Sequence, residues 1–267
     1  MNDVKANLKQ PVPDESKVLE DIPGGETNLL PISVLDEDLQ ITFELWPNSN
    51  PSPGSPEKLQ LYWNSAVVKE RTYDTPINDW DLVIFLPSGR LINGVHTLHY
   101  DVSSPTTGLS TSDPTTLTVD QIPPVFASNN AMQLPEDLPA LDGVPTITKA
   151  YLDGHPAGVP VGIPGWPTPK PGDQVLGFIE WEEDTEGQYP FQTLTLTQDT
   201  IGAPAVLTLT ADVLETNNNS TRYLSYRLKD RAGNMTAGYS RKTKIRVDVS
   251  EAARNLPAVT VVPFLTA

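Results

Sequence analysis

The sequence lacks cysteine, long apolar runs and clustered basic residues. The absence of cysteine excludes disulfide bonds, thiolate chemistry and cysteine-based zinc sites, so packing alone must stabilise the fold. No run reaches the roughly eighteen apolar residues of a membrane-spanning helix, so we expect no membrane insertion. Residues 1–11 contain no apolar segment of a signal peptide, so export would need a signal that this segment does not show.

Positive charge is scarce, because 18 Lys and Arg stand against 34 Asp and Glu, for a formal net charge of −16. A surface that binds nucleic acid needs clustered Lys and Arg to contact phosphates, so we expect no nucleic-acid partner. Acidic oxygens suit divalent cations such as calcium. A solvated acidic surface that maintains solubility is the simpler interpretation of the same charge.

Local signatures of common catalytic sites are also missing. The chain has no Gly-x-Ser-x-Gly elbow and no phosphate-binding glycine loop. His96 and His99 are three residues apart on an expected strand, so they face opposite sides of it and cannot act jointly. No pattern pairs two carboxylates as a glycosidase requires. We therefore expect that the protein is not an enzyme.

What the sequence does contain is strand and turn chemistry, with 27 Pro and 17 Gly. Residues 39–46 alternate apolar and polar side chains, which predicts a half-buried strand. Residues 223–228 and 242–249 alternate in the same way. Between them, 230–234 is a turn sequence in which Gly233 can adopt a positive φ. These two segments are expected to form the closing hairpin of a β-sandwich.

About seven strands are expected between residues 30 and 120, which is the number in an immunoglobulin-type sandwich. The prolines in 121–124 then interrupt the pattern and indicate a domain boundary. We therefore expect an all-β fold of two tandem immunoglobulin-like antiparallel β-sandwiches. The expected divisions are a flexible leader over 1–26, domain 1 over 27–122, domain 2 over 123–250 with a Pro/Gly-rich opening segment, and a linker or the start of a further repeat over 251–267.

The two halves of the chain repeat one another. Tyr226 corresponds to Tyr100, and Asp248 corresponds to Asp120, each within a similar strand sequence. The match also pairs two segments that end on tryptophan, 175–181 and 39–46. Self-similarity at this spacing predicts two copies of one fold.

Three motifs carry a resemblance to a known family: Tyr226-Arg-Leu-Lys-Asp-Arg-Ala-Gly-Asn234, the strand that ends in Val-Asp, and the Val-Asp-x-x-Pro-Pro junction at 119–124. They resemble the tandem bacterial Ig-like repeats of large surface and adhesin-type proteins. In the first domain, Ser104-Pro-Thr-Thr-Gly108 stands in place of 230–234. The resemblance implies a non-catalytic stalk or adhesive binding module, extracellular or at the cell surface, with a protein or glycan receptor as partner.

The resemblance also implies calcium near domain junctions, with Asp120, Asp230 and Asp248 as the candidate ligands here. Asp230 has a simpler role as well, because an aspartate at the start of a turn accepts hydrogen bonds from its own loop. Calcium is the single cofactor considered, and the alternative is that the chain binds none.

A second interpretation is a glycan-binding module. Tyr151, Trp166 and Trp80 lie in stretches rich in turn residues and proline, where we expect them to be exposed and able to stack on sugars. Because prolines forbid a central strand, the segment 131–172 is expected to run extended along a sheet edge. A secreted toxin or effector component is a third interpretation, and the oligomeric state does not follow from the sequence.

Overall fold

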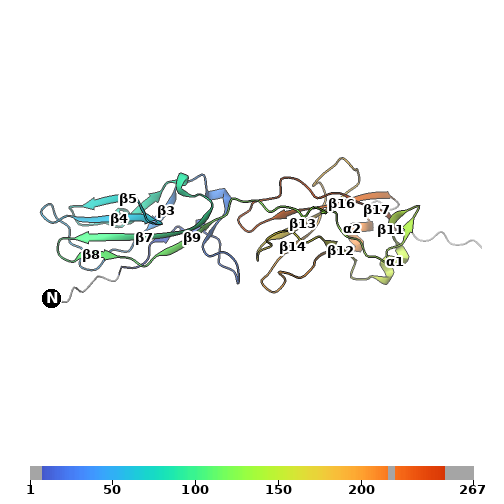
Figure 1. The fold of residues 1–267 in the computed structure, drawn as a ribbon, viewed down its shortest axis with the longest axis horizontal. Helices are drawn as coiled ribbons and strands as arrows, with labels where there is room; N and C mark the ends of the chain where they lie inside the picture. Colours follow the sequence, from blue (N-terminus) through green and yellow to red (C-terminus); the bar gives the residue numbers. More distant parts are fainter. Residues whose placement is uncertain (1–7, 216–219, 250–267) are drawn as a thin grey trace, which may run out of the picture.

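In the computed structural model, which describes residues 8–215 and 220–249, two β-sandwiches lie end to end (Figure 1). Each sandwich has an apolar core of its own, which contains Tyr100 in the first domain and Tyr226 in the second. The expected all-β fold of two tandem immunoglobulin-like sandwiches is therefore confirmed. Within the described ranges, no helix has the length and apolar character needed to cross a bilayer.

The first domain packs a three-stranded sheet against a six-stranded sheet. The strands of the three-stranded sheet follow the order β1 (Val12–Pro13), β3 (Leu39–Thr42) and β6 (Val83–Leu86). The strands of the six-stranded sheet follow the order β2 (Leu29–Leu30), β9 (Thr115–Val119), β7 (Gly94–Ser104), β4 (Glu57–Trp63) and β5 (Ala66–Tyr73), and β8 (Gly108–Thr111) also pairs with β7. Short 3-10 helices are η1 (Glu15–Lys17), η2 (Ile32–Val34), η3 (Asp79–Leu82) and η4 (Ser88–Arg90).

The second domain has a six-stranded and a two-stranded sheet. The first has the order β10 (Ala140–Leu141), β11 (Val144–Thr148), β17 (Thr243–Asp248), β16 (Ser220–Lys229), β13 (Gln174–Glu180) and β14 (Pro190–Thr195). The second pairs β12 (Val159–Ile163) with β15 (Ala205–Leu209). Two short helices are α1 (Lys149–Gly154) and α2 (Ala211–Glu215).

One strand in each domain carries the repeated tyrosine in the same setting. The backbone N–H of Tyr100 donates to Ser112 Oγ at 3.0 Å, and that of Tyr226 donates to Ser240 Oγ at 3.0 Å. The expected hairpin is also present, because β16 pairs antiparallel with β17. The correspondence of the two tyrosines is therefore confirmed, and the structure contains two copies of one fold.

The correspondence drawn from the tryptophans is wrong. Opposite Tyr100 lies Leu61 of β4, and opposite Tyr226 lies Gly177 of β13, so β13 corresponds to β4. The counterpart of β3 is β12, because β12 pairs with β15 as β3 pairs with β6. A single shared tryptophan is a weak marker of register, since one aromatic residue is compatible with several strands of a sandwich.

The flexible leader expected over 1–26 is corrected for its described part. Leu8 is only 2% exposed, and Val12 and Pro13 pair with Thr42 and Ile41 of β3. This segment gave no sequence signal, because a two-residue strand is too short to show a period. Residues 1–7 and the expected linker over 251–267 lie outside the described residues.

The proline-rich segment 131–172 contains more structure than expected. It forms β10, β11, α1 and β12, and β11 lies between β10 and β17. Pro160 is tolerated in β12 because that strand pairs fully on one side only, with β15, and touches Gln133 through a single bridge at Gly162 on the other.

Candidate binding site and domain junction

The three aromatic residues expected to bind a ligand do not form one surface. Trp80 lies in η3 of the first domain and is 78% exposed, as expected. Trp166 is only 8% exposed and packs in the core of the second domain, so its expected exposure is wrong. The half-buried Tyr151 of α1 donates from its hydroxyl to Asp137 Oδ1 at 3.0 Å and stacks on His155 at 4.2 Å.

Trp166 is buried in the core cluster to which β12, β13 and β15 also contribute. Its ring lines a cavity of about 350 Å³ together with Ile163 and Leu196. A large apolar ring gains more from such packing than from exposure to water. Trp80 is therefore the exposed stacking surface among the three.

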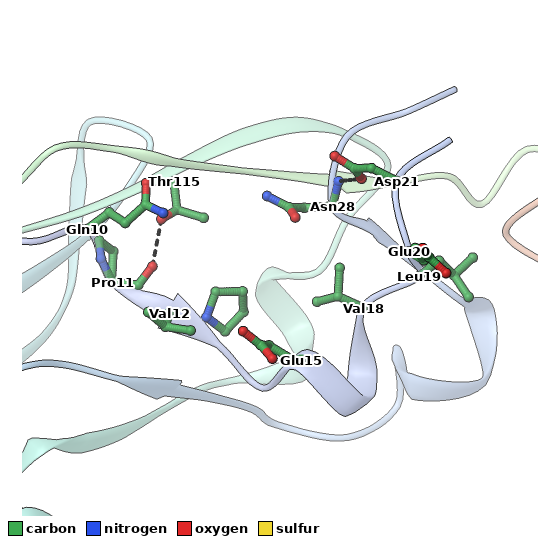
Figure 2. Close-up of a pocket in the computed structure, with 11 residues that line it drawn as sticks. Gln10, Pro11, Val12, Glu15, Val18, Leu19, Glu20, Asp21, Asn28 and Thr115 are labelled. Carbon is green, nitrogen blue, oxygen red and sulfur yellow. Dashed lines mark hydrogen bonds between the residues drawn. The ribbon is translucent and has the colours of Figure 1, made fainter. Parts of the chain in front are cut away.

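Figure 2 shows a second cavity, of about 310 Å³, under the N-terminal segment. The hydroxyl of Thr115 donates to the carbonyl of Pro11 at 2.6 Å, and the N–H of Asn28 donates to Asp21 Oδ1 at 2.8 Å. The first bond fastens the N-terminal segment to β9, the second closes a loop within that segment, and we assign this cavity no catalytic role.

Two of the three candidate calcium ligands come together. Asp120 and Asp230 line one cavity of about 430 Å³ where the first domain meets the second. Asp248 lies opposite Thr148 where β17 ends, next to α1, and Figure 1 shows α1 at the end of the second domain that points away from the first. The structure therefore separates Asp248 from the other two.

Asp230 fastens its own turn, which confirms its simpler role. Its Oδ1 accepts hydrogen bonds from the backbone N–H groups of Gly233 and Asn234, both at 2.8 Å. Its Oδ2 accepts from Asn234 Nδ2 at 2.7 Å. Gly233 has a φ of +104°, a conformation that glycine adopts without the strain other residues would incur.

Lys170 places its ammonium group between acidic residues at the junction. Its Nζ lies 2.8 Å from Asp120 Oδ2 and 2.8 Å from Glu26 Oε1. Burial alone would lower the pKa of Lys170, but the hydrogen bonds to Asp120 and Glu26 outweigh it and raise that pKa. Lys170 therefore stays charged and ties the second domain to the first.

Arg231 and Asn234 add hydrogen bonds across the same junction. Arg231 donates to the backbone carbonyls of Glu26, at 2.7 Å, and of Glu20. Asn234 Nδ2 donates to the carbonyl of Asp120 at 2.9 Å. We call Glu26, Asp120, Lys170, Arg231 and Asn234 the junction cluster.

The junction cluster leaves little room for calcium. Asp230 uses its oxygens within its turn, and Asp120 is paired with a lysine ammonium. In the part of the chain that the structure describes, no three His, Asp or Glu side chains are arranged to hold a metal ion. The geometry therefore fits calcium poorly, and calcium binding stays an untested prediction.

Asp173 is the most unusual carboxyl group of the junction. It is 3% exposed, its Oδ2 accepts from the N–H of Lys170 at 2.9 Å, and its Oδ1 has no hydrogen-bond partner. Burial, with smaller contributions from Asp230 and Glu26, raises the pKa of Asp173 to about 6. Burial also raises the pKa of Asp230. No local pattern in the sequence marks Glu26, Lys170 or Asp173, because their partners are distant in the chain.

No family model matches the chain, and no curated protein matches it. It is similar to a structure reported for the host cell surface retention of a 1.5-MDa bacterial ice-binding adhesin, with 14% identity, a TM-score of 0.37, and coverage of 92% of this chain and 67% of that chain. It is similar to the fibronectin(III)-like modules of Clostridium thermocellum CbhA, with 11% identity, a TM-score of 0.38, and coverage of 90% and 93%.

A third similarity is to SGBP-B of the Bacteroides ovatus mixed-linkage glucan utilization locus, solved with a mixed-linkage heptasaccharide. It has 13% identity, a TM-score of 0.24, and coverage of 89% of this chain and 47% of that chain. At these TM-scores the three similarities carry no argument about function, and the fold assignment rests on the strand order above.

Proposed function

We propose that the chain is a non-catalytic spacer and adhesive binding module of a larger bacterial surface-associated protein. It works outside the cell or at its surface, and its loops contact a protein or glycan receptor. The observation that carries this proposal is the junction cluster, which joins two end-to-end sandwiches by ion pairs and hydrogen bonds.

The junction supports a spacer because it restricts how the second domain can move relative to the first. Lys170 forms ion pairs with Glu26 and with Asp120, which follows β9. Arg231 donates a hydrogen bond to the backbone carbonyl of Glu26, in the segment before β2. The backbone N–H of Ile32 also donates to the carbonyl of Ala232 at 2.9 Å. Backbone hydrogen bonds and side-chain ion pairs together hold the relative orientation of two domains better than a flexible linker does.

Spin labels test whether the two domains keep a fixed orientation. Because the chain has no cysteine, Lys69→Cys in β5 and Thr193→Cys in β14 add one exposed labelling position per domain. At pH 5, pulsed electron–electron double resonance should give one narrow distribution of the distance between the two spin labels. Arg231→Ala should broaden it, because two hydrogen bonds to the first domain are lost.

Arg241→Ala removes the same charge at an exposed position and should leave the distribution narrow. A broad distribution in the labelled chain without the Arg231 change would show that the domains move freely. That result would overturn the spacer function.

Trp80 favours glycan binding as the second candidate. It is the most exposed of the large apolar side chains in the described residues, and it stands between Asp79 and Asp81, whose carboxylates suit sugar hydroxyls. A glycan array tests this candidate directly, since a stacking site should bind a defined set of sugars.

A further inference from the structure

Two buried carboxylate oxygens of residues that line the junction cavity accept no hydrogen bond. They are Asp173 Oδ1 in the second domain and Glu26 Oε2 in the first. Arg231 Nη1 lies 3.8 Å from Glu26 Oε2, beyond hydrogen-bond distance. The Asp173 carboxylate accepts a single hydrogen bond, and its burial raises its pKa, so its protonated state is favoured relative to that of an exposed aspartate.

The first domain has a carboxyl group at the same position, with many more hydrogen-bond donors around it. Lys58 lies opposite Ser103 and Gln174 lies opposite Lys229, so Glu57 corresponds to Asp173. Glu57 accepts four hydrogen bonds: from Trp46 Nε1 at 2.7 Å, Ser49 Oγ at 2.8 Å, the N–H of Asn50 at 3.2 Å and Ser104 Oγ at 3.2 Å. Asp173 accepts one. The first domain therefore surrounds the carboxyl group at this position with donors, and the second does not.

We propose that the junction is pH-sensitive: protonation of Asp173 strengthens the contact between the two domains, and its ionisation weakens that contact. This inference rests on the proposed spacer function and adds regulation to it. An acidic medium would then give the more rigid spacer, and a neutral or alkaline medium the more flexible one.

Charge around Asp173 supports this direction. The charged groups that share its cavity are the carboxylates of Glu26, Asp120 and Asp230 and the ammonium of Lys170, and the guanidinium of Arg231 lies beside Glu26. With Asp173 protonated, three carboxylates face two cations, and its ionisation makes this four against two. The added charge repels the acids that Lys170 holds and sits in a poorly solvated position.

The pH range follows from the folded and unfolded states of Asp173. Its pKa is about 6 in the fold against an ordinary value of 3.8 for aspartate, so the folded state binds the proton more tightly. The resulting stabilisation is fully present below the unfolded value and is lost as the pH rises through about 6. Two pKa units correspond to roughly a hundredfold change in the ratio of folded to unfolded protein.

The experiment uses the Lys69→Cys, Thr193→Cys spin-labelled chain at pH 5 and pH 8, with EDTA present. We expect a narrow distance distribution at pH 5 and a broader one at pH 8. Asp173→Asn, which mimics the protonated group, should keep it narrow at both values. Asp184→Asn makes the same chemical change at an exposed position and should keep the pH difference.

Equally narrow distributions at both pH values, or a pH difference that survives in Asp173→Asn, would overturn the pH-sensitive junction. A broad distribution at pH 5 as well would instead overturn the spacer function, so the two failures are distinguishable. If Asp173→Asn does not fold, the carboxyl carbon resonance of Asp173 in the unaltered chain decides the question. It should titrate near pH 6, and a midpoint near 4 would refute the proposal.

Discussion

The loop after β7 in the first domain and the loop after β16 in the second occupy the same position in the repeated fold, but they make different contacts. In the first domain, Ser104 turns inward and donates to Glu57, so the loop contacts its own domain. In the second, the corresponding hairpin starts at Asp230 and sends Arg231 and Asn234 to the neighbouring domain. Loops tolerate substitution better than strands, so an interdomain contact evolves in the loops while the fold stays the same.

At the end of the second domain that points away from the first, the fold is again repeated while the contacts differ. Leu30 lies opposite Val119 and Ile147 lies opposite Val247, so the position of Glu26 is occupied there by Gly143. Asp248 keeps the acid of Asp120, but the glutamate that shares Lys170 has no counterpart. The fold is repeated and the junction cluster is not.

The largest expected effect separates the two cores. Leu228→Asp should unfold the second domain, because a buried unpaired charge costs more than about 5 kcal/mol, comparable with the stability of a whole domain. Val102→Asp, at the corresponding position, should unfold the first domain. Calorimetry of each variant should show one transition, and loss of all cooperative unfolding in both would mean that the domains fold as one unit.

A smaller effect of opposite sign distinguishes the two corresponding carboxyl groups. Glu57→Gln should destabilise the first domain by about 1–3 kcal/mol, because an amide cannot accept all four hydrogen bonds. Asp173→Asn should instead stabilise the second domain at pH 8, because it removes a poorly solvated charge. Chemical denaturation at pH 8 checks both signs, and the same sign for both variants would contradict the comparison.

The smallest expected effect concerns calcium. Since Lys170 already pairs with both Asp120 and Glu26, melting temperatures in EDTA and in excess calcium should agree. A ligand that binds only the folded state raises the melting temperature, so a rise with calcium would show a site that the junction cluster does not explain. Calorimetry with magnesium in place of calcium is the control for a general effect of divalent cations.

Sequence patterns predicted the parts of the fold that depend on local alternation and turn chemistry. The hairpin of β16 and β17, the turn that Asp230 fastens and the matching tyrosines were all expected, because each has a signature within a few residues. The fold class followed from the number and spacing of such segments.

The contacts that join the domains had no such signature. Lys170 and Glu26 are far apart in the chain, so neither residue alone indicates the ion pair that they form. The prolines around Trp166 predict an exposed ring, yet the ring packs in the core, because turn composition does not determine which side of a loop faces inward. A segment as short as β1 shows no period at all.

The parallel pairing at one edge of each larger sheet has a mechanical consequence. β2 runs parallel to β9, and β11 runs parallel to β17, so the early and late strands of each domain lie side by side and point the same way. When a domain is stretched between its early and late strands, such neighbours slide past each other, and their hydrogen bonds share the tension. Three residue pairs resist this sliding in the second domain. In the first, two pairs do so together with hydrogen bonds from Asn28 Nδ2 to the carbonyl of Thr116 and from Thr118 Oγ1 to the carbonyl of Thr27, so the parallel contact of each domain bears tension.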